Sequence, residues 1–297
     1  MPYLLLVLTV LFWAGNVVSA RAIHVEMGPL TLAFLRWGLV LLLVLPWALP
    51  RIWRNREIIR RNWLILLVLS ILSVGCFNTF IYIGLQNTTA SNATLMQSAA
   101  PVIILLLSAL LFKEPIKLRQ WAGVVTSLIG VAILISQADL SVLLGLNFNT
   151  GDIWVATAIL TWSCYSVALR WRPADLDGFT LFSFNVLVGV IALAPFALME
   201  QGQSIEIHWS PAVISAILYM AIFPSILSYM FWNKGVAELG AARAGLFIHL
   251  MPLFGVILSV VFLGETLQLF HAAGMLLIFT GIYLATVSQT LSKLRRS

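Results

Sequence analysis

Residues 84–130 read GLQNTTASNATLMQSAAPVIILLLSALLFKEPIKLRQWAGVVTSLIG, and residues 235–281 read GVAELGAARAGLFIHLMPLFGVILSVVFLGETLQLFHAAGMLLIFTG. The two stretches share residues at the same relative positions. The shared pairs are Gly84/Gly235, Ala90/Ala241, Ala93/Ala244, Pro101/Pro252, Ser108/Ser259, Glu114/Glu265, Gly123/Gly274 and Gly130/Gly281. Matched proline and glutamate carry more weight than matched leucine, because leucine is abundant in apolar sequence. The second half of the chain therefore repeats the first.

The repeat extends toward the N-terminus, where matched residues are 149 positions apart in the sequence instead of 151. There the matched pairs are Trp13/Trp162, Arg21/Arg170, Thr31/Thr180, Leu32/Leu181, Pro46/Pro195, Ala48/Ala197 and Leu49/Leu198. The change of offset falls between Leu49 and Gly84, where a loop can absorb it.

The composition indicates an integral membrane protein. Hydrophobic residues make up 61% of the chain and charged residues only 9%, against about a quarter charged in soluble domains. Apolar runs recur at the ~20-residue length of a membrane-spanning helix. They cover residues 3–22, 29–49, 63–85, 89–112, 118–137, 151–171, 178–199, 211–234, 239–263 and 268–290. We predict an all-α integral membrane fold with ten transmembrane helices, divided into a repeat over 1–137, a second over 151–290 and a basic tail over 291–297.

Each repeat holds five spans, and this odd number fixes their relative orientation. The second copy must cross the bilayer upside down relative to the first. Two inverted repeats that meet at the bilayer midplane are typical of secondary transporters.

The basic residues gather in alternate loops. With a cytoplasmic N-terminus, the inner loops and tail hold nearly all of them, including Arg54, Lys117, Arg172 and Arg295, whereas the outer loops hold only Arg21. This is the positive-inside distribution, which predicts that both termini are cytoplasmic. The net charge of +6 is thus explained by topology and by contact with membrane lipids, and we expect no nucleic-acid partner.

Several stretches resemble the EamA-type transporters of the drug/metabolite transporter superfamily. The resemblance is carried by Leu11-Phe12-Trp13-Ala14-Gly15-Asn16, by Phe34-Leu35-Arg36-Trp37, and by the ordered set from Thr89 to Gly130 with its echo from Ala241 to Gly281. It implies two inverted five-helix repeats, a central cavity and the movement of small metabolites. Bacterial relatives often export amino acids, which implies a bacterial-type inner (plasma) membrane.

Polar and aromatic side chains at membrane depth are candidates for a substrate site, because they are costly there. Tryptophan usually prefers the membrane interface, so the matched mid-span pair Trp13 and Trp162 suggests the wall of a cavity. The predicted substrate-binding residues are Trp13, Asn16, Asn78, Tyr82, Gln97, Trp162, Tyr165, Tyr229 and His249. The matched prolines Pro101 and Pro252 are predicted hinges.

Two charged or titratable residues leave alternatives open. His249 lies about 15 Å into its helix, either as a neutral histidine bonded to another helix or as a substrate contact or titratable gate. Arg36 is either structural or an anion-binding group, and the second role requires that it face the cavity. None of the eleven acidic residues lies mid-span, and Glu114 and Glu265 are at helix ends. The repeated glycines, Gly123 with Gly130 and Gly274 with Gly281, predict close packing of helices five and ten.

Transport competes with two other function classes. A regulated channel would need a charged pore ring, which the sequence does not offer; the main alternative is an integral-membrane enzyme acting on lipid or isoprenoid substrates. The sequence lacks HExxH, GxSxG, an aspartate-rich pair and metal-ligand spacing, and Cys76 and Cys164 lie apart inside apolar spans. We therefore expect a transporter with no enzymatic activity, no metal and no cofactor. The lack of a P-loop excludes an ATPase motor in this chain. The expected substrate is a small neutral, zwitterionic or weakly anionic molecule. The sequence leaves the oligomeric state open, a monomer included.

Overall fold

The computed structural model describes residues 1–88, 93, 96–113, 115–136, 139, 141, 149–202, 207–263 and 269–286, and these form helices and short connections. Glu114, Glu265, most of the loop between Gln137 and Gly151, and the 291–297 tail lie outside the described residues. The helices of the first half are α1 (Pro2–Ala22), α2 (Pro29–Arg54), α3 (Arg56–Arg61), α4 (Trp63–Ser70), η1 (Ile71–Phe77), α5 (Asn78–Asn87), α7 (Ala100–Phe112) and α8 (Leu118–Ser136). Those of the second half are α10 (Thr150–Ala168), η2 (Leu169–Trp171), α11 (Gly178–Gln201), α12 (Pro211–Met220), η3 (Ala221–Leu227), α13 (Ser228–Leu239), α14 (Ala241–Gly245), η4 (Leu246–His249), α15 (Leu250–Leu263) and α16 (Leu269–Thr286).

Six helical stretches among the described residues are long and apolar enough to cross a membrane. They cover Pro2–Ala22, Pro29–Arg54, Trp63–Asn87, Thr150–Trp171, Gly178–Gln201 and Pro211–Leu239. Four shorter apolar helices, Ala100–Phe112, Leu118–Leu134, Ala241–Gly255 and Leu269–Ala285, occupy the positions predicted for spans four, five, nine and ten. The described residues thus confirm an all-helical fold with apolar helices suited to a membrane, and its division into ten spans and two inverted repeats stays a prediction.

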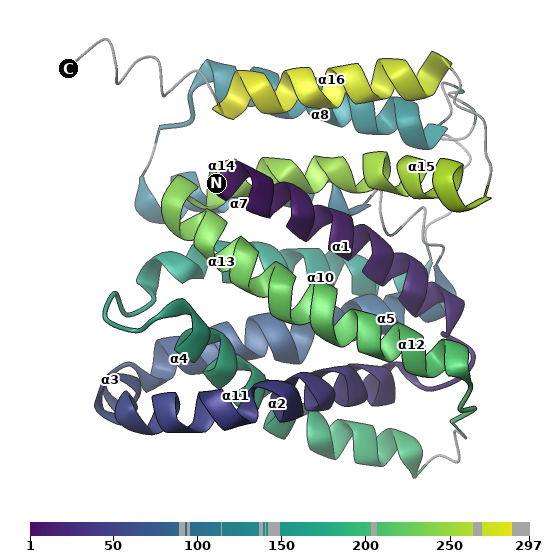
Figure 1. The fold of residues 1–297 in the computed structure, drawn as a ribbon. Helices are drawn as coiled ribbons and strands as arrows, with labels where there is room; N and C mark the ends of the chain where they lie inside the picture. The colour runs from purple at the N-terminus through teal and green to yellow at the C-terminus, as the bar shows by residue number, and fades with distance from the viewer. Residues whose placement is uncertain are drawn as a thin grey trace.

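Most of the long helices of one half pack against helices of the other half. α8 and α16 lie side by side at one edge of the bundle, and α2 packs against α11 at the opposite edge (Figure 1). Between them α1 packs against α13, and α10 packs against α5. The hydrophobic core is therefore shared by the two halves and belongs to neither alone.

Glycines allow α8 and α16 to approach closely, as the sequence predicts. A Cβ atom added to Gly123 would lie 2.5 Å from the carbonyl oxygen of Gly281, and one added to Gly130 would lie 2.7 Å from that of Gly274. Backbones that come this close leave no room for a larger residue, so small residues are required along this contact.

Residues that the repeat matches also contact one another in the interior. The rings of Trp13 and Trp162 pack edge to face with centroids 4.9 Å apart. Ser98 and His249 occupy the same position in the two repeated stretches, and His249 Nε2 lies 2.9 Å from the Ser98 carbonyl oxygen. Nearby, Asn78 at the start of α5 donates a hydrogen bond of 3.1 Å from Nδ2 to the hydroxyl of Tyr229 in α13.

Helical geometry is interrupted at matched places. The π-helical segments η1 and η3 interrupt the third and eighth predicted spans, 150 residues apart. Pro101 is the second residue of α7, which begins directly after a turn at Ser98 and Ala99, and Pro252 is the third residue after the 3-10 turn η4. Proline cannot donate the intrahelical hydrogen bond that a continuous helix would need here. These breaks coincide with the predicted hinges, and the hinge role stays a prediction.

The glycine contact between α8 and α16 can be tested by one methyl group. We expect Gly123→Ala to destabilise the protein by about 1–3 kcal/mol, because the new Cβ atom would strike the Gly281 carbonyl. Gly38→Ala in α2 is the matched control, since nothing lies within 4 Å of its added Cβ atom, and it should keep or raise stability. Thermal unfolding of both purified variants measures the difference, and equal stability would contradict the close-packing account.

Candidate functional site

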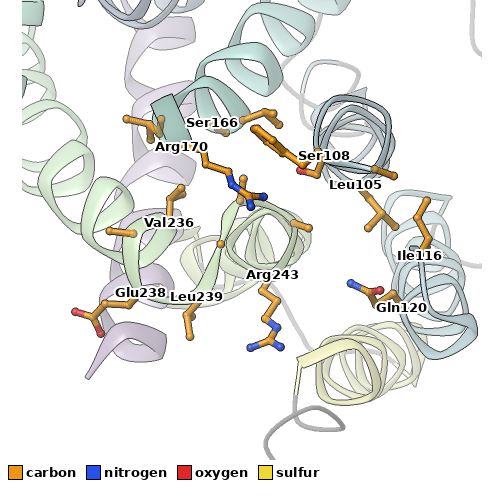
Figure 2. A pocket seen from close by; sticks show the side chains of 18 of the residues that line it. Leu105, Ser108, Ile116, Gln120, Ser166, Arg170, Val236, Glu238, Leu239 and Arg243 are labelled. Atoms are coloured by element: carbon orange, nitrogen blue, oxygen red, sulfur yellow. The ribbon is translucent and has the colours of Figure 1, made fainter. Parts of the chain in front are cut away.

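A cavity of about 750 Å³ opens at one end of the bundle. Both halves contribute to its wall, which is formed by the end of α7 and start of α8, the end of α10 with η2, and the end of α13 with α14 (Figure 2). The connection between α13 and α14 depends on Gly240, whose φ of +84° favours glycine. This volume suits a small molecule.

The described residues at the cavity mouth carry more positive than negative charge. The basic residues are Lys117, Arg170, Arg172 and Arg243, and the acidic residue is Glu238. Figure 2 shows Arg170 extending into the cavity and Glu238 pointing away from it; the Arg170 guanidinium lies over the Phe112 ring at 4.1 Å. The mouth is therefore electropositive.

Two buried side chains of the cavity wall each carry a polar atom without a hydrogen-bond partner. Ser166 of α10 is fully buried and Asn233 of α13 is 3% exposed, and both line the cavity. The Ser166 hydroxyl and the Asn233 Nδ2 have no partner, while Asn233 Oδ1 accepts a hydrogen bond of 2.7 Å from the Tyr165 hydroxyl. Buried polar groups are normally paired, so these two atoms of the cavity wall lack partners that such groups usually have.

An aromatic cluster lies deeper in the bundle around Trp162. Its ring lies within 5.4 Å, centroid to centroid, of those of Trp13, Phe77, Tyr229 and Trp232. A small space of about 10 Å³ beside this cluster is lined by Trp13, Phe77, Gln97, Ala100, Ile159, Trp162, Ile248 and Met251. It holds roughly one water molecule, so a substrate would have to displace side chains to enter it.

A polar cluster around Arg36 joins the two halves. The guanidinium is 1% exposed and donates hydrogen bonds of 2.6 Å to Ser225 Oγ, 2.8 Å to Asn78 Oδ1 and 2.5 Å to the Tyr82 hydroxyl. The Tyr82 hydroxyl in turn lies 3.2 Å from Asn16 Oδ1. All of these partners are neutral, and no carboxylate among the described residues pairs with Arg36.

Further contacts close the end of the bundle opposite the cavity mouth. Glu200, at the end of α11, accepts hydrogen bonds from the backbone N–H groups of Leu30 and Thr31 at the start of α2. A carboxylate at a helix N-terminus stabilises the helix dipole. The Thr88 hydroxyl donates a 2.5 Å hydrogen bond to Asp152 at the start of α10, whose other end borders the mouth. These contacts join the first half to the second.

His249 is held by both ring nitrogens. It is fully buried, with Nδ1 2.5 Å from Ser127 Oγ and Nε2 2.9 Å from the Ser98 carbonyl oxygen. Because a carbonyl only accepts, Nε2 carries the proton, and a neutral ring can then accept from Ser127 at Nδ1. This geometry favours the neutral, interhelical alternative, and His249 is not among the described residues lining either space.

The predicted site residues thus divide into groups. Trp13, Gln97 and Trp162 border the small space; Asn16, Asn78, Tyr82 and Tyr229 belong to the Arg36 cluster; Tyr165 bonds to Asn233. None of the nine is among the described residues that line the large cavity, and the substrate role of each stays a prediction. Sequence reasoning missed Ser166 and Asn233, although each lies within one helical turn of a buried tryptophan.

Comparison with known proteins identifies the family. The sequence profile of the EamA-like transporter family matches residues 1–136 and 149–287. A protein of Archaeoglobus fulgidus named as an uncharacterized transporter is 30% identical over 289 residues, covering 97% of this chain and 98% of the relative. The uncharacterized transporter YyaM of Bacillus subtilis is 27% identical, covering 77% of this chain and 74% of the relative.

A solved crystal structure has the same fold, with a TM-score of 0.75, 20% sequence identity and 98% of each chain covered. The chain belongs to the EamA-like transporter family. It is a multi-pass membrane protein, and its relatives point to a transporter rather than an enzyme.

The cavity can be tested by comparing two serines in a background without Cys76 and Cys164. We expect Ser108→Cys, in the cavity wall, to react with a small water-soluble thiol reagent, because water reaches it. Ser73→Cys should react at least about tenfold more slowly, since Ser73 is fully buried and lines neither described space. Mass spectrometry of the purified variants gives both rates, and similar rates would contradict the described cavity.

Proposed function

We propose that this protein is a secondary transporter that exports small amphipathic metabolites, such as amino acids or related compounds, or facilitates their passage, by alternating access. The observation that carries the proposal is the asymmetry of the bundle. The cavity is open at one end, and at the other end the Arg36 cluster, Glu200 and Asp152 hold the halves together. A site open to one side only is what one end-state of such a cycle requires.

Two inverted five-helix repeats would supply the second end-state. Support comes from the direct contacts of matched residues, Trp13 with Trp162 and Ser98 with His249. If a two-fold axis relates the repeats, a residue that contacts its own counterpart must lie beside that axis. Further support comes from the crossed glycine contacts, Gly123 with Gly281 and Gly130 with Gly274, which the same operation exchanges.

We assign the open end to the cytoplasm. Its wall contains Lys117, Arg170, Arg172 and Arg243, in agreement with the positive-inside distribution. With this assignment both termini are cytoplasmic, and a bacterial-type inner membrane remains part of the proposal.

The moving parts of the cycle follow from the helix breaks. The turn at Ser98 and Ala99 before Pro101 and the η4 turn before Pro252 leave each helix with fewer continuous hydrogen bonds. Helix bends occur at such points. We assign Pro101 and Pro252 as the hinges at which each repeat opens or closes one end.

Flux into proteoliposomes with and without an imposed pH gradient tests transport and its coupling. The compounds are radiolabelled amino acids and short organic acids, and protein-free vesicles are the control. We expect saturable uptake that reaches equilibrium without accumulation, because no acidic residue lies mid-span and both His249 nitrogens are already hydrogen-bonded.

The variant His249→Gln completes this test. It should transport without gaining any response to the gradient. Strong gradient-driven accumulation that survives this substitution would contradict facilitated transport, and an absence of protein-dependent flux across the panel would contradict transport itself.

A further inference from the structure

The unpaired polar atoms of the interior are mostly hydrogen-bond donors. Among the described residues, eight buried side-chain polar atoms have no partner, of which six are nitrogens and two are hydroxyls. The six nitrogens belong to Trp37, Gln97, Trp162, Asn185, Trp232 and Asn233. An indole N–H can only donate, so the tryptophans among them require an acceptor. What the interior lacks is a group that accepts hydrogen bonds.

Several of these donors border the spaces a substrate would use. Asn233 and the Ser166 hydroxyl line the large cavity, and Gln97 and Trp162 line the small space beyond. Ser166 follows Trp162 by four residues in α10, so the two lie on the same face of that helix. The donors therefore continue from the cavity toward the aromatic cluster.

Arg36 lies beyond the aromatic cluster. Trp162 packs against Tyr229 with ring centroids 5.4 Å apart, Tyr229 accepts a hydrogen bond from Asn78, and Asn78 accepts one from Arg36. The guanidinium bonds through Nε and Nη1, and no described residue bonds to Nη2. A buried charge without a counterion is costly, and a planar guanidinium matches a carboxylate with two parallel hydrogen bonds.

We propose that the transported compound is a small organic carboxylate, and that Arg36 determines this preference. The inference rests on the proposed transport function and narrows its substrate class. The electropositive mouth attracts the anion, the unpaired groups of Ser166, Asn233, Gln97 and Trp162 donate hydrogen bonds to its oxygens in turn, and the aromatic rings contact its apolar part.

The position of Arg36 between the halves connects recognition to the transport cycle. Its bond to Ser225 crosses from the first half to the second and must break when that end opens. A substrate carboxylate replaces the lost acceptor and neutralises the guanidinium, whereas an amide or an amine cannot do both. Acids should therefore be bound more tightly than neutral or cationic compounds of the same shape.

Binding to the purified full-length protein tests this preference. The probes are straight-chain monocarboxylates of about four to eight carbons, each compared with its own amide and primary amine by calorimetry and thermal shift. We expect at least one acid to bind about tenfold or more tightly than its amide, as a charge-assisted bidentate contact would give. Arg36→Gln should remove that advantage, and Arg36→Lys should retain part of it.

The control is Arg51→Gln, in the same helix, because the exposed Arg51 guanidinium bonds to the Trp47 carbonyl and lies over the Phe179 ring, and it lines neither described space; it should leave the advantage unchanged. If Arg36→Gln does not fold, Trp162→Phe keeps an aromatic ring, removes one donor, and should lower the ratio of acid to amide affinity. Equal or tighter binding of amides or amines, no binding of any acid, or an advantage that survives Arg36→Gln would overturn the inference.

Counterflow in vesicles separates this inference from the proposed function. Acid-selective binding without any flux would refute transport alone. Flux of amides or amines with no preference for acids would refute the carboxylate assignment alone.

Discussion

A positive charge buried in an apolar bundle constrains the whole closed end of this protein. Arg36 has almost no contact with solvent and no acidic partner among the described residues, so three neutral oxygens from two helical segments, η3 and α5, must surround it. Those oxygens come from both halves, through Ser225 on one side and Asn78 and Tyr82 on the other. The halves are therefore held together at this end, and the cavity opens at the other. If the halves separate here, the guanidinium needs a new acceptor.

The sequence was sufficient to predict the helical architecture, because the signals for it are local. Apolar runs of spanning length need no tertiary information, and the helices fall where those runs predict. Contacts between matched residues were partly predictable as well. Gly123 and Gly130 recur at one helical face with counterparts in the second half, and such glycines require a close partner, which proved to be α16. Matched tryptophans in mid-span likewise pack against each other.

The candidate site was harder to predict, because the cavity lies where the ends of neighbouring helices are spread apart, and the sequence does not show at which end of the bundle this happens. Polarity and depth selected Asn78, Tyr82 and Tyr229, but those properties are shared by groups that close a bundle and groups that line a cavity. Ser166 and Asn233 were missed because their importance lies in lacking partners, which only three-dimensional packing can reveal. The neutral environment of Arg36 was equally hidden, since its partners are 42 to 189 residues away in the chain.

The proposed cycle requires the contacts at the closed end to break, and a reversible cross-link tests this most directly. The His208 N–H donates a 3.0 Å hydrogen bond to the Glu26 carbonyl, joining the loop after α1 to the segment before α12. Cysteines would replace both residues in a background without Cys76 and Cys164, and counterflow would be measured in proteoliposomes before and after oxidation. The account predicts that the disulfide abolishes counterflow, that reduction restores it, and that neither single variant responds. Unchanged counterflow with the disulfide fully formed would contradict alternating access through this end of the bundle.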